Sequence, residues 1–131
     1  IKPDATKRNI TGKINQIIEQ SGLRIIAQKR LKLSTNQARE FYSVHRKRSF
    51  FNDLIEYMTS EPVIVQILEG VDAVNKYREI MGTTNPKDAK EGTIRKEVAL
   101  NVQENSVHGS DSIENAKIEI EFFFNKEDIV G

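Results

Sequence analysis

The chain has 131 residues, of which 37% are hydrophobic and 30% are charged, as is typical of a globular domain. Its 20 basic and 19 acidic side chains leave a net charge of +1, which argues against dedicated nucleic-acid binding. The chain contains no cysteine, and this excludes disulfides, thiolate catalysis and cysteine-based zinc sites. No apolar run approaches membrane-spanning length, so we expect no membrane association. The length of the chain predicts one domain over residues 1–131.

The first third of the chain predicts two strands and a helix. Ile1-Lys2-Pro3 is typical of the tail of a strand, because the residue before a proline favours extended geometry. The chain starts without methionine, and we expect this first strand to be truncated. Isoleucines recur at helical spacing between residues 10 and 18, and Gly22 is expected to end that helix. Apolar and polar side chains then alternate over residues 23–33, which indicates a long strand.

The middle of the chain predicts two helices and a second strand. Ser34-Thr35 supplies a cap for a helix that runs towards His45. A basic linker at residues 46–49 leads into a second helix, predicted by apolar residues at helical spacing over 50–58. The apolar run at residues 63–68 follows a proline and predicts a strand that is buried on both faces.

The next part of the chain predicts one helix and two irregular segments. Asp72 is expected to cap a helix that ends at Gly82. Residues 83–92 are rich in turn-forming residues. Residues 93–107 show no clean periodicity, and we interpret them as a loop that wraps the surface and returns to the sheet.

The last element, residues 113–124, fits two structures. Ile118, Ile120 and Phe122 alternate with charges as in a strand, yet the wider apolar spacing also fits a helix. Its length and the potential cap at Ser112 favour the helix. Helix-rich connections between strands then predict an α+β fold: a ferredoxin-like two-layer sandwich, with an antiparallel β-sheet covered by α-helices.

The strongest chemical candidate is the stretch Asn105–Ser112, which puts a single histidine, His108, beside a glycine, hydroxyls and a carboxylate. Histidine can act as a nucleophile or proton carrier near neutral pH, but a capped turn with an incidental histidine fits these residues as well. Lys2, Arg78 and Arg95 could bind phosphate, although each alone is equally consistent with a solvated surface cation. No P-loop, dinucleotide-binding or zinc-protease motif is present.

Five short motifs occur in the order and spacing of one enzyme family. They are Ile1-Lys2-Pro3-Asp4, Phe41-Tyr42 with Phe50-Phe51, Gly82-Thr83-Thr84-Asn85-Pro86, Gly92-Thr93-Ile94-Arg95 and Asn105-Ser106-Val107-His108-Gly109-Ser110-Asp111. The last resembles the Asn-x-x-His-Gly-Ser-Asp signature of the nucleoside diphosphate kinases. The resemblance covers essentially the whole chain, and five motifs in register are far more specific than one.

The resemblance implies a ferredoxin-like core and ping-pong transfer of a γ-phosphate from a nucleoside triphosphate, typically ATP, to a nucleoside diphosphate, which maintains nucleotide pools. His108 matches the nucleophile that carries the phosphate as phosphohistidine, and a neutral imidazole needs no base to remove a proton. Glu119 matches the residue that orients this imidazole, with help from Ser110. Tyr42 matches a tyrosine that lines the same site.

The resemblance also assigns nucleotide contacts. The residues that match phosphate contacts are Arg78, Thr84, Arg95 and His45. Lys2 and Asn105 match contacts to the sugar hydroxyls, with Lys2 also near the transferred phosphate. Phe50 with Leu54 matches the clamp on the base, and stacking without contacts to base edges would explain broad base tolerance. Mg²⁺ is expected to arrive with the nucleotide phosphates, so no metal ligands are expected in the chain.

The resemblance further implies a homo-oligomer, with a tetramer favoured over a hexamer, and a cytoplasmic enzyme.

Two alternative functions, from classes other than a nucleotide kinase, are also consistent with the sequence. One is a binding module that acts through the basic residues 45–48, although the near-neutral charge argues against it. The other is a phosphohistidine relay that passes its phosphate to another protein, and a base clamp at Phe50 makes this relay less expected.

Overall fold

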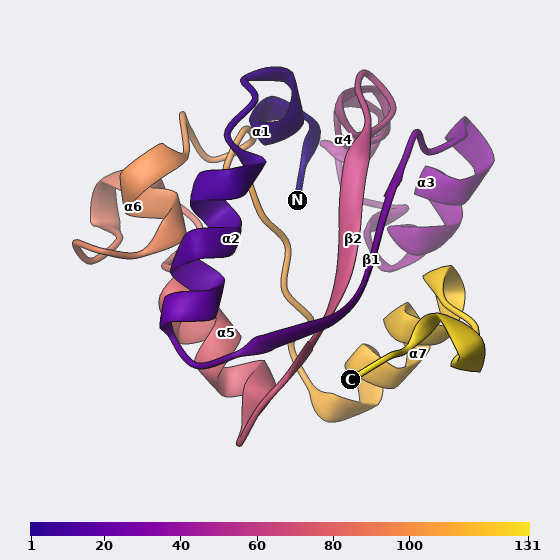
Figure 1. The fold of residues 1–131 in the computed structure, drawn as a ribbon. Helices are drawn as coiled ribbons and strands as arrows, with labels where there is room; N and C mark the ends of the chain where they lie inside the picture. Colours follow the sequence, from indigo (N-terminus) through magenta and orange to yellow (C-terminus); the bar gives the residue numbers. More distant parts are fainter.

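The computed structural model describes all residues from 1 to 131, and its centre is a pair of antiparallel strands (Figure 1). Strand β1 spans Arg24–Leu31 and strand β2 spans Val63–Glu69. The pairing sets Arg24 opposite Glu69, and it is irregular between Ile25 and Ala27. Because of this irregularity both Ile26 and Ala27 are buried, which breaks the alternation of a regular strand.

The N-terminal residues and the segment before His108 extend the sheet beyond β2. The backbone of Ile1 forms hydrogen bonds with that of Ile64 in both directions, at 2.6 and 3.1 Å. The N–H of Lys2 donates in turn to the carbonyl of Ser106, at 2.8 Å. The order β1, β2, residues 1–2 and residue 106 corresponds to the β-α-β-β-α-β pattern of a ferredoxin-like fold, and the predicted α+β class is confirmed.

Seven helices and three short 3₁₀ turns surround the strands. The helices are α1 (Pro3–Lys7), α2 (Thr11–Gln20), α3 (Thr35–Phe41), α4 (Phe51–Met58), α5 (Ala73–Met81), α6 (Ile94–Val98) and α7 (Ile113–Phe123). The 3₁₀ turns are η1 (Ser43–His45), η2 (Pro86–Asp88) and η3 (Lys126–Asp128). None of these helices has the length and apolar character that would let it span a membrane.

Two main hydrophobic clusters hold the helices in place. One joins α2, α5 and α6 through side chains such as Ile14, Met81 and Ile94, and the other joins α3 and α4 through Ala38 and Ile55. Figure 1 shows α2, α5 and α6 on one side of the strand pair and α3 on the other. Burial of apolar surface in both clusters is the main force that fixes the elements around the site.

Several predicted helix boundaries are confirmed because the side chains act as caps. The Ser34 hydroxyl accepts a hydrogen bond from the N–H of Gln37, and the Gln37 side-chain oxygen accepts one from the N–H of Ser34, which completes a capping box. The Ser112 hydroxyl accepts from the N–H of Asn115 at 3.0 Å and starts α7, so the helical interpretation of the last element is correct. Gly22, with a φ of 94°, follows the end of α2.

Three predictions about local structure are wrong. Strand β2 is buried on both faces only in part: Val63 and Ile67 are buried, whereas the residues between them, such as Val65, are half-buried. Asp72 occupies the N-cap of α5 without capping it, because its φ is 51° and its carboxylate binds the side-chain amide of Asn75.

The third wrong prediction concerns residues 93–107, which are not entirely a loop. Residues 94–98 form α6, and the Thr93 hydroxyl caps it by accepting from the N–H of Lys96 at 3.3 Å. The rest of the segment returns to the sheet at Ser106, as predicted.

Candidate active site

His108 lies in the loop before α7, with one ring nitrogen engaged and the other open. Its Nε2 atom forms a hydrogen bond with the carboxylate of Glu119. Glu119 lies on α7, and the Ser112 cap fixes where this helix begins and so where Glu119 stands relative to the loop. The Nδ1 atom has no hydrogen-bond partner in the chain, and 40% of the side chain is exposed. The carboxylate therefore selects the tautomer that carries its proton on Nε2 and leaves a lone pair on Nδ1.

Two arginines hold the backbone on either side of His108. Arg95 is buried and donates to the carbonyls of Val107 at 2.9 Å, Gly82 at 3.1 Å and Asn105 at 3.4 Å. Arg78 donates to the carbonyl of Gly109 at 3.0 Å. In this structure both guanidinium groups thus fix the loop itself.

Lys2 reaches the same loop from the N-terminal segment. Its ammonium group donates to the side-chain oxygen of Asn105 at 2.8 Å. Burial, and next the nearby Arg95, lower the pKa of Lys2 to about 8, while Asp4 opposes this shift. A lysine with this pKa changes its charge in the pH range where many enzymes work.

Aromatic rings flank the imidazole and lead away from it. The rings of Phe41 and Tyr42 meet His108 edge-on, with centroids at 5.4 and 6.2 Å. Tyr42 is stacked with His45 at 6.4 Å, and His45 lies 5.5 Å from Phe50. Burial, with a smaller contribution from Glu119, raises the pKa of the Tyr42 hydroxyl, so this group stays protonated near neutral pH.

This row of rings ends at a side chain that is open to solvent. Phe50 is 46% exposed at the start of α4, and Leu54 lies half-buried one turn further along that helix. Thr84 lies exposed just before η2 and makes no hydrogen bond with the residues around His108. Ser110 lines the cavity beside His108 but forms no hydrogen bond with Glu119.

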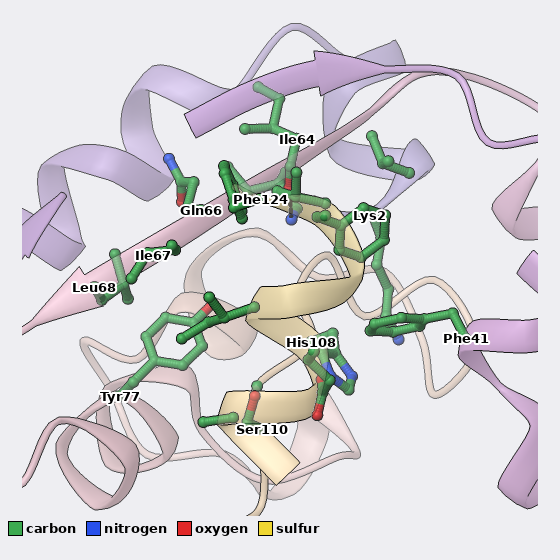
Figure 2. Close-up of a pocket in the computed structure, with 18 of the residues that line it drawn as sticks. Lys2, Phe41, Ile64, Gln66, Ile67, Leu68, Tyr77, His108, Ser110 and Phe124 are labelled. Carbon is green, nitrogen blue, oxygen red and sulfur yellow. Dashed lines mark hydrogen bonds and ion pairs between the residues drawn. The ribbon is translucent and has the colours of Figure 1, made fainter. Parts of the chain in front are cut away.

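A cavity of about 190 Å³ extends from His108 between β2 and α7. Figure 2 shows Lys2, Phe41 and His108 at one end of this space and Leu68 and Tyr77 towards the other. Its lining is mostly apolar, and its two charged side chains, Lys2 and Glu119, lie near His108. A charged ligand would therefore find its partners at that end.

Sequence reasoning missed the role of Phe41, whose ring packs against His108 as well as Phe122 and Phe123. The only available signal was its position next to Tyr42 at the end of α3. It also missed Asp4, which binds Ser106 two residues before His108. Nothing in the spacing of the sequence indicates that contact.

The arrangement is suited to taking up an electrophile with negative charge. It offers an open nitrogen lone pair, a carboxylate behind the ring, and three cationic side chains nearby. Cations beside a nucleophile stabilise the negative charge of a transferring phosphoryl group.

Comparisons with known proteins point to one family. The family model described as "Nucleoside diphosphate kinase" matches residues 1–129. Curated relatives named nucleoside diphosphate kinase are 63% identical in Phenylobacterium zucineum and 60% identical in Erythrobacter litoralis; each match covers 100% of this chain and 94% of the relative.

Solved structures agree with these relatives. A crystal form of the Aquifex aeolicus nucleoside diphosphate kinase has a TM-score of 0.95 at 41% identity, covering 99% of this chain and 94% of that one. The halophilic nucleoside diphosphate kinase of Halobacterium salinarum, in complex with CDP, has a TM-score of 0.94 at 34% identity, covering 100% of this chain and 88% of that one.

The close approach of Gly109 to α5 can be tested by adding a methyl group. A Cβ at Gly109 would lie 3.0 Å from two ring carbons of Tyr77 and 3.2 Å from the sulfur of Met81. We expect Gly109→Ala to lower the free energy of unfolding by about 1–3 kcal/mol, as overpacking does. Urea unfolding measures this change, and adding Tyr77→Leu should recover at least half of it. Gly12→Ala is the control, since a Cβ there meets nothing within 4 Å; wild-type stability of Gly109→Ala would contradict the contact.

Proposed function

The chain belongs to the nucleoside diphosphate kinase family and is a phosphotransferase, and we propose that it transfers the γ-phosphate by a ping-pong reaction through phosphohistidine on His108. One observation carries this proposal. Glu119 occupies Nε2 of the imidazole, so Nδ1 is the nitrogen that is free to attack. The substrates are a nucleoside triphosphate and then a nucleoside diphosphate.

The chemistry follows from the tautomer. The Nδ1 lone pair forms a bond to the γ-phosphorus, and the bond from phosphorus to the bridging oxygen breaks, so the diphosphate leaves with that electron pair. The ring becomes positive as the new bond forms, and the Glu119 carboxylate stabilises this charge through the Nε2–H. An incoming diphosphate reverses the same steps and regenerates the free histidine.

The cations are proposed to bind the phosphates. A guanidinium has five N–H donors, and hydrogen bonds to backbone carbonyls use three from Arg95 and one from Arg78. Donors therefore remain on both side chains for phosphate oxygens. Lys2, which binds Asn105, is proposed to contact the sugar hydroxyls and the transferred phosphate, while His45 and Thr84 complete the phosphate contacts.

Phe50 and Leu54 are proposed to hold the base. Phe50 is the most exposed ring of the row that leads to His108, so its face is available for stacking. Stacking without hydrogen bonds to base edges accepts any base, because every base has a π-face. The relative from Halobacterium salinarum is described in complex with CDP, and this supports a nucleoside diphosphate as a ligand of the present chain.

Mg²⁺ is proposed to arrive with the nucleotide. Three cations, Lys2, Arg78 and Arg95, contact the loop, and no group of three or more metal-binding side chains occurs in the chain. These residues fit a metal that is held by phosphate oxygens and water, where it would neutralise part of the phosphate charge.

We also propose a cytoplasmic homo-oligomer, with a tetramer favoured over a hexamer. Light scattering of the purified protein measures the mass of the assembly and so distinguishes the two.

The transfer is tested by labelling. The protein is incubated with Mg²⁺ and γ-labelled ATP, and unlabelled GDP is added afterwards. We expect acid-labile, base-stable label on the wild type, none on His108→Ala, and recovery of the label in GTP. Label that stays on the protein after GDP is added would indicate a relay to another protein. Absence of label from a correctly folded protein would overturn the enzymatic proposal.

The role of Glu119 is tested by removing its charge. Glu119→Gln keeps the size of the side chain but weakens its hold on the Nε2–H, and we expect the rate of labelling to fall by about 10–100-fold, as for other partners that orient a histidine. Glu121→Gln, on the same helix but exposed, is the matched control and should label at the wild-type rate. Equal rates in the two variants would contradict this role.

The lowered pKa of Lys2 predicts a dependence on pH. In the free protein Lys2 is positive below about pH 8 and loses its charge above it, so its attraction for phosphate disappears as the pH rises. Above that pKa we expect kcat/KM for labelling by Mg·ATP to decrease with pH, and the decrease should approach about tenfold for each pH unit. This parameter is used because kcat/KM reports ionisations of the free enzyme. Lys2→Met should be slower throughout and lack this decline; the same decline in that variant would assign it to another group.

A further inference from the structure

Ser106 has a backbone conformation that is rare for a residue with a side chain. Its φ is 72°, in the left-handed region, and the residue is completely buried. The N–H of Val107 donates to the carbonyl of Asn105 at 2.9 Å, so the chain turns tightly at Ser106. His108 follows two residues later, and the direction in which the chain leaves this turn decides where the imidazole lies.

Residues near the N-terminus bind every polar group of Ser106. Its N–H donates to Oδ1 of Asp4 at 3.2 Å, and its hydroxyl donates to Oδ2 at 2.7 Å. Its carbonyl accepts from the N–H of Lys2 at 2.8 Å. Strained backbone persists where the surroundings determine it, and these three hydrogen bonds do so here.

The carboxylate of Asp4 is itself fixed. Its side chain is 1% exposed, and the guanidinium of Arg8 lies 2.9 Å from Oδ2. Arg8 also donates to the carbonyl of Val98 at 2.8 Å, and the Tyr57 hydroxyl donates to the other carboxylate oxygen. Buried charges need such partners, and a fully satisfied network of this kind is rigid.

We propose that Asp4 is a positioning residue for phosphoryl transfer, a role that rests on the proposed function. Asp4 holds Ser106 in the left-handed conformation and thereby sets His108 and Lys2 at a fixed separation. Both ends of this connection adjoin Ser106: Asn105, which binds the Lys2 ammonium, precedes it, and His108 follows it by two residues. Without the carboxylate the turn is free to relax to negative φ, which displaces the imidazole.

The test compares three substitutions around one carboxylate. Asp4→Asn keeps the size of the side chain but removes its charge and one of its two acceptor oxygens, so the N–H and the hydroxyl of Ser106 can no longer each donate to its own oxygen. Ser106→Ala removes the hydroxyl and keeps the strained backbone, whereas Ser106→Gly removes the hydroxyl but adopts a positive φ without strain. Tyr57→Phe is the matched control, because it removes another hydrogen bond to Asp4 and leaves both bonds to Ser106 in place.

Three quantities are measured: the labelling rate at saturating Mg·ATP, the Kd for ADP, and the circular dichroism spectrum. We expect Asp4→Asn to label at least about 10-fold more slowly with a change in Kd below about threefold, since small displacements of a reacting group cost rate. Ser106→Ala should be slower than Ser106→Gly, and Tyr57→Phe should stay within about twofold of the wild type.

The outcomes separate the two proposals. Wild-type protein that is never labelled overturns the kinase mechanism and, with it, the role of Asp4. Two results overturn the positioning role alone, provided that the wild type is labelled. One is an unchanged labelling rate in folded Asp4→Asn. The other is a slower rate in Asp4→Asn that is matched by an equal rise in the Kd for ADP. If Asp4→Asn does not fold, equal rates in Ser106→Ala and Ser106→Gly, both at the wild-type value, overturn it.

Discussion

The structure depends above all on how the loop before α7 is held. Arg95 binds three backbone carbonyls, at Gly82, Asn105 and Val107, and this ties the end of α5 to the loop that carries the histidine. A buried guanidinium is one of the few groups that can satisfy several carbonyls at once, because its donors point in fixed directions. The approach of Gly109 to Tyr77 and the hydrogen bond of His108 to Glu119 both require the loop to stay in this position.

Electrostatics explains why a chain of almost neutral net charge can receive a highly charged ligand. The 20 basic and 19 acidic residues nearly cancel over the whole molecule, but Lys2, Arg78 and Arg95 converge on one loop. Half-buried Lys2 and buried Arg95 both have lowered pKa values, because partial or full loss of solvent disfavours their charge. Under the proposed phosphate contacts, a phosphate between these two side chains would offset the cost of burying their charge.

The sequence predicted those features that local side chains determine. The caps at Ser34 and Ser112 are visible in the sequence because a hydroxyl binds an N–H three residues ahead, and the His108 motif is recognisable by its residues alone. Helix α6 was missed because five residues are too few to show a helical repeat. The left-handed turn at Ser106 was missed for another reason: it is stabilised by Asp4, which lies 102 residues away in the sequence.

The row of rings from Phe50 through His45 and Tyr42 to His108 has a consequence for selectivity under the proposed mechanism. Donor and acceptor nucleotides use the same row in succession, so they cannot be distinguished by separate recognition surfaces. Any preference for one base then speeds both half-reactions for that base equally. Such a catalyst brings every triphosphate-to-diphosphate ratio in its solution towards one common value, and the most abundant pair sets that value for all the others.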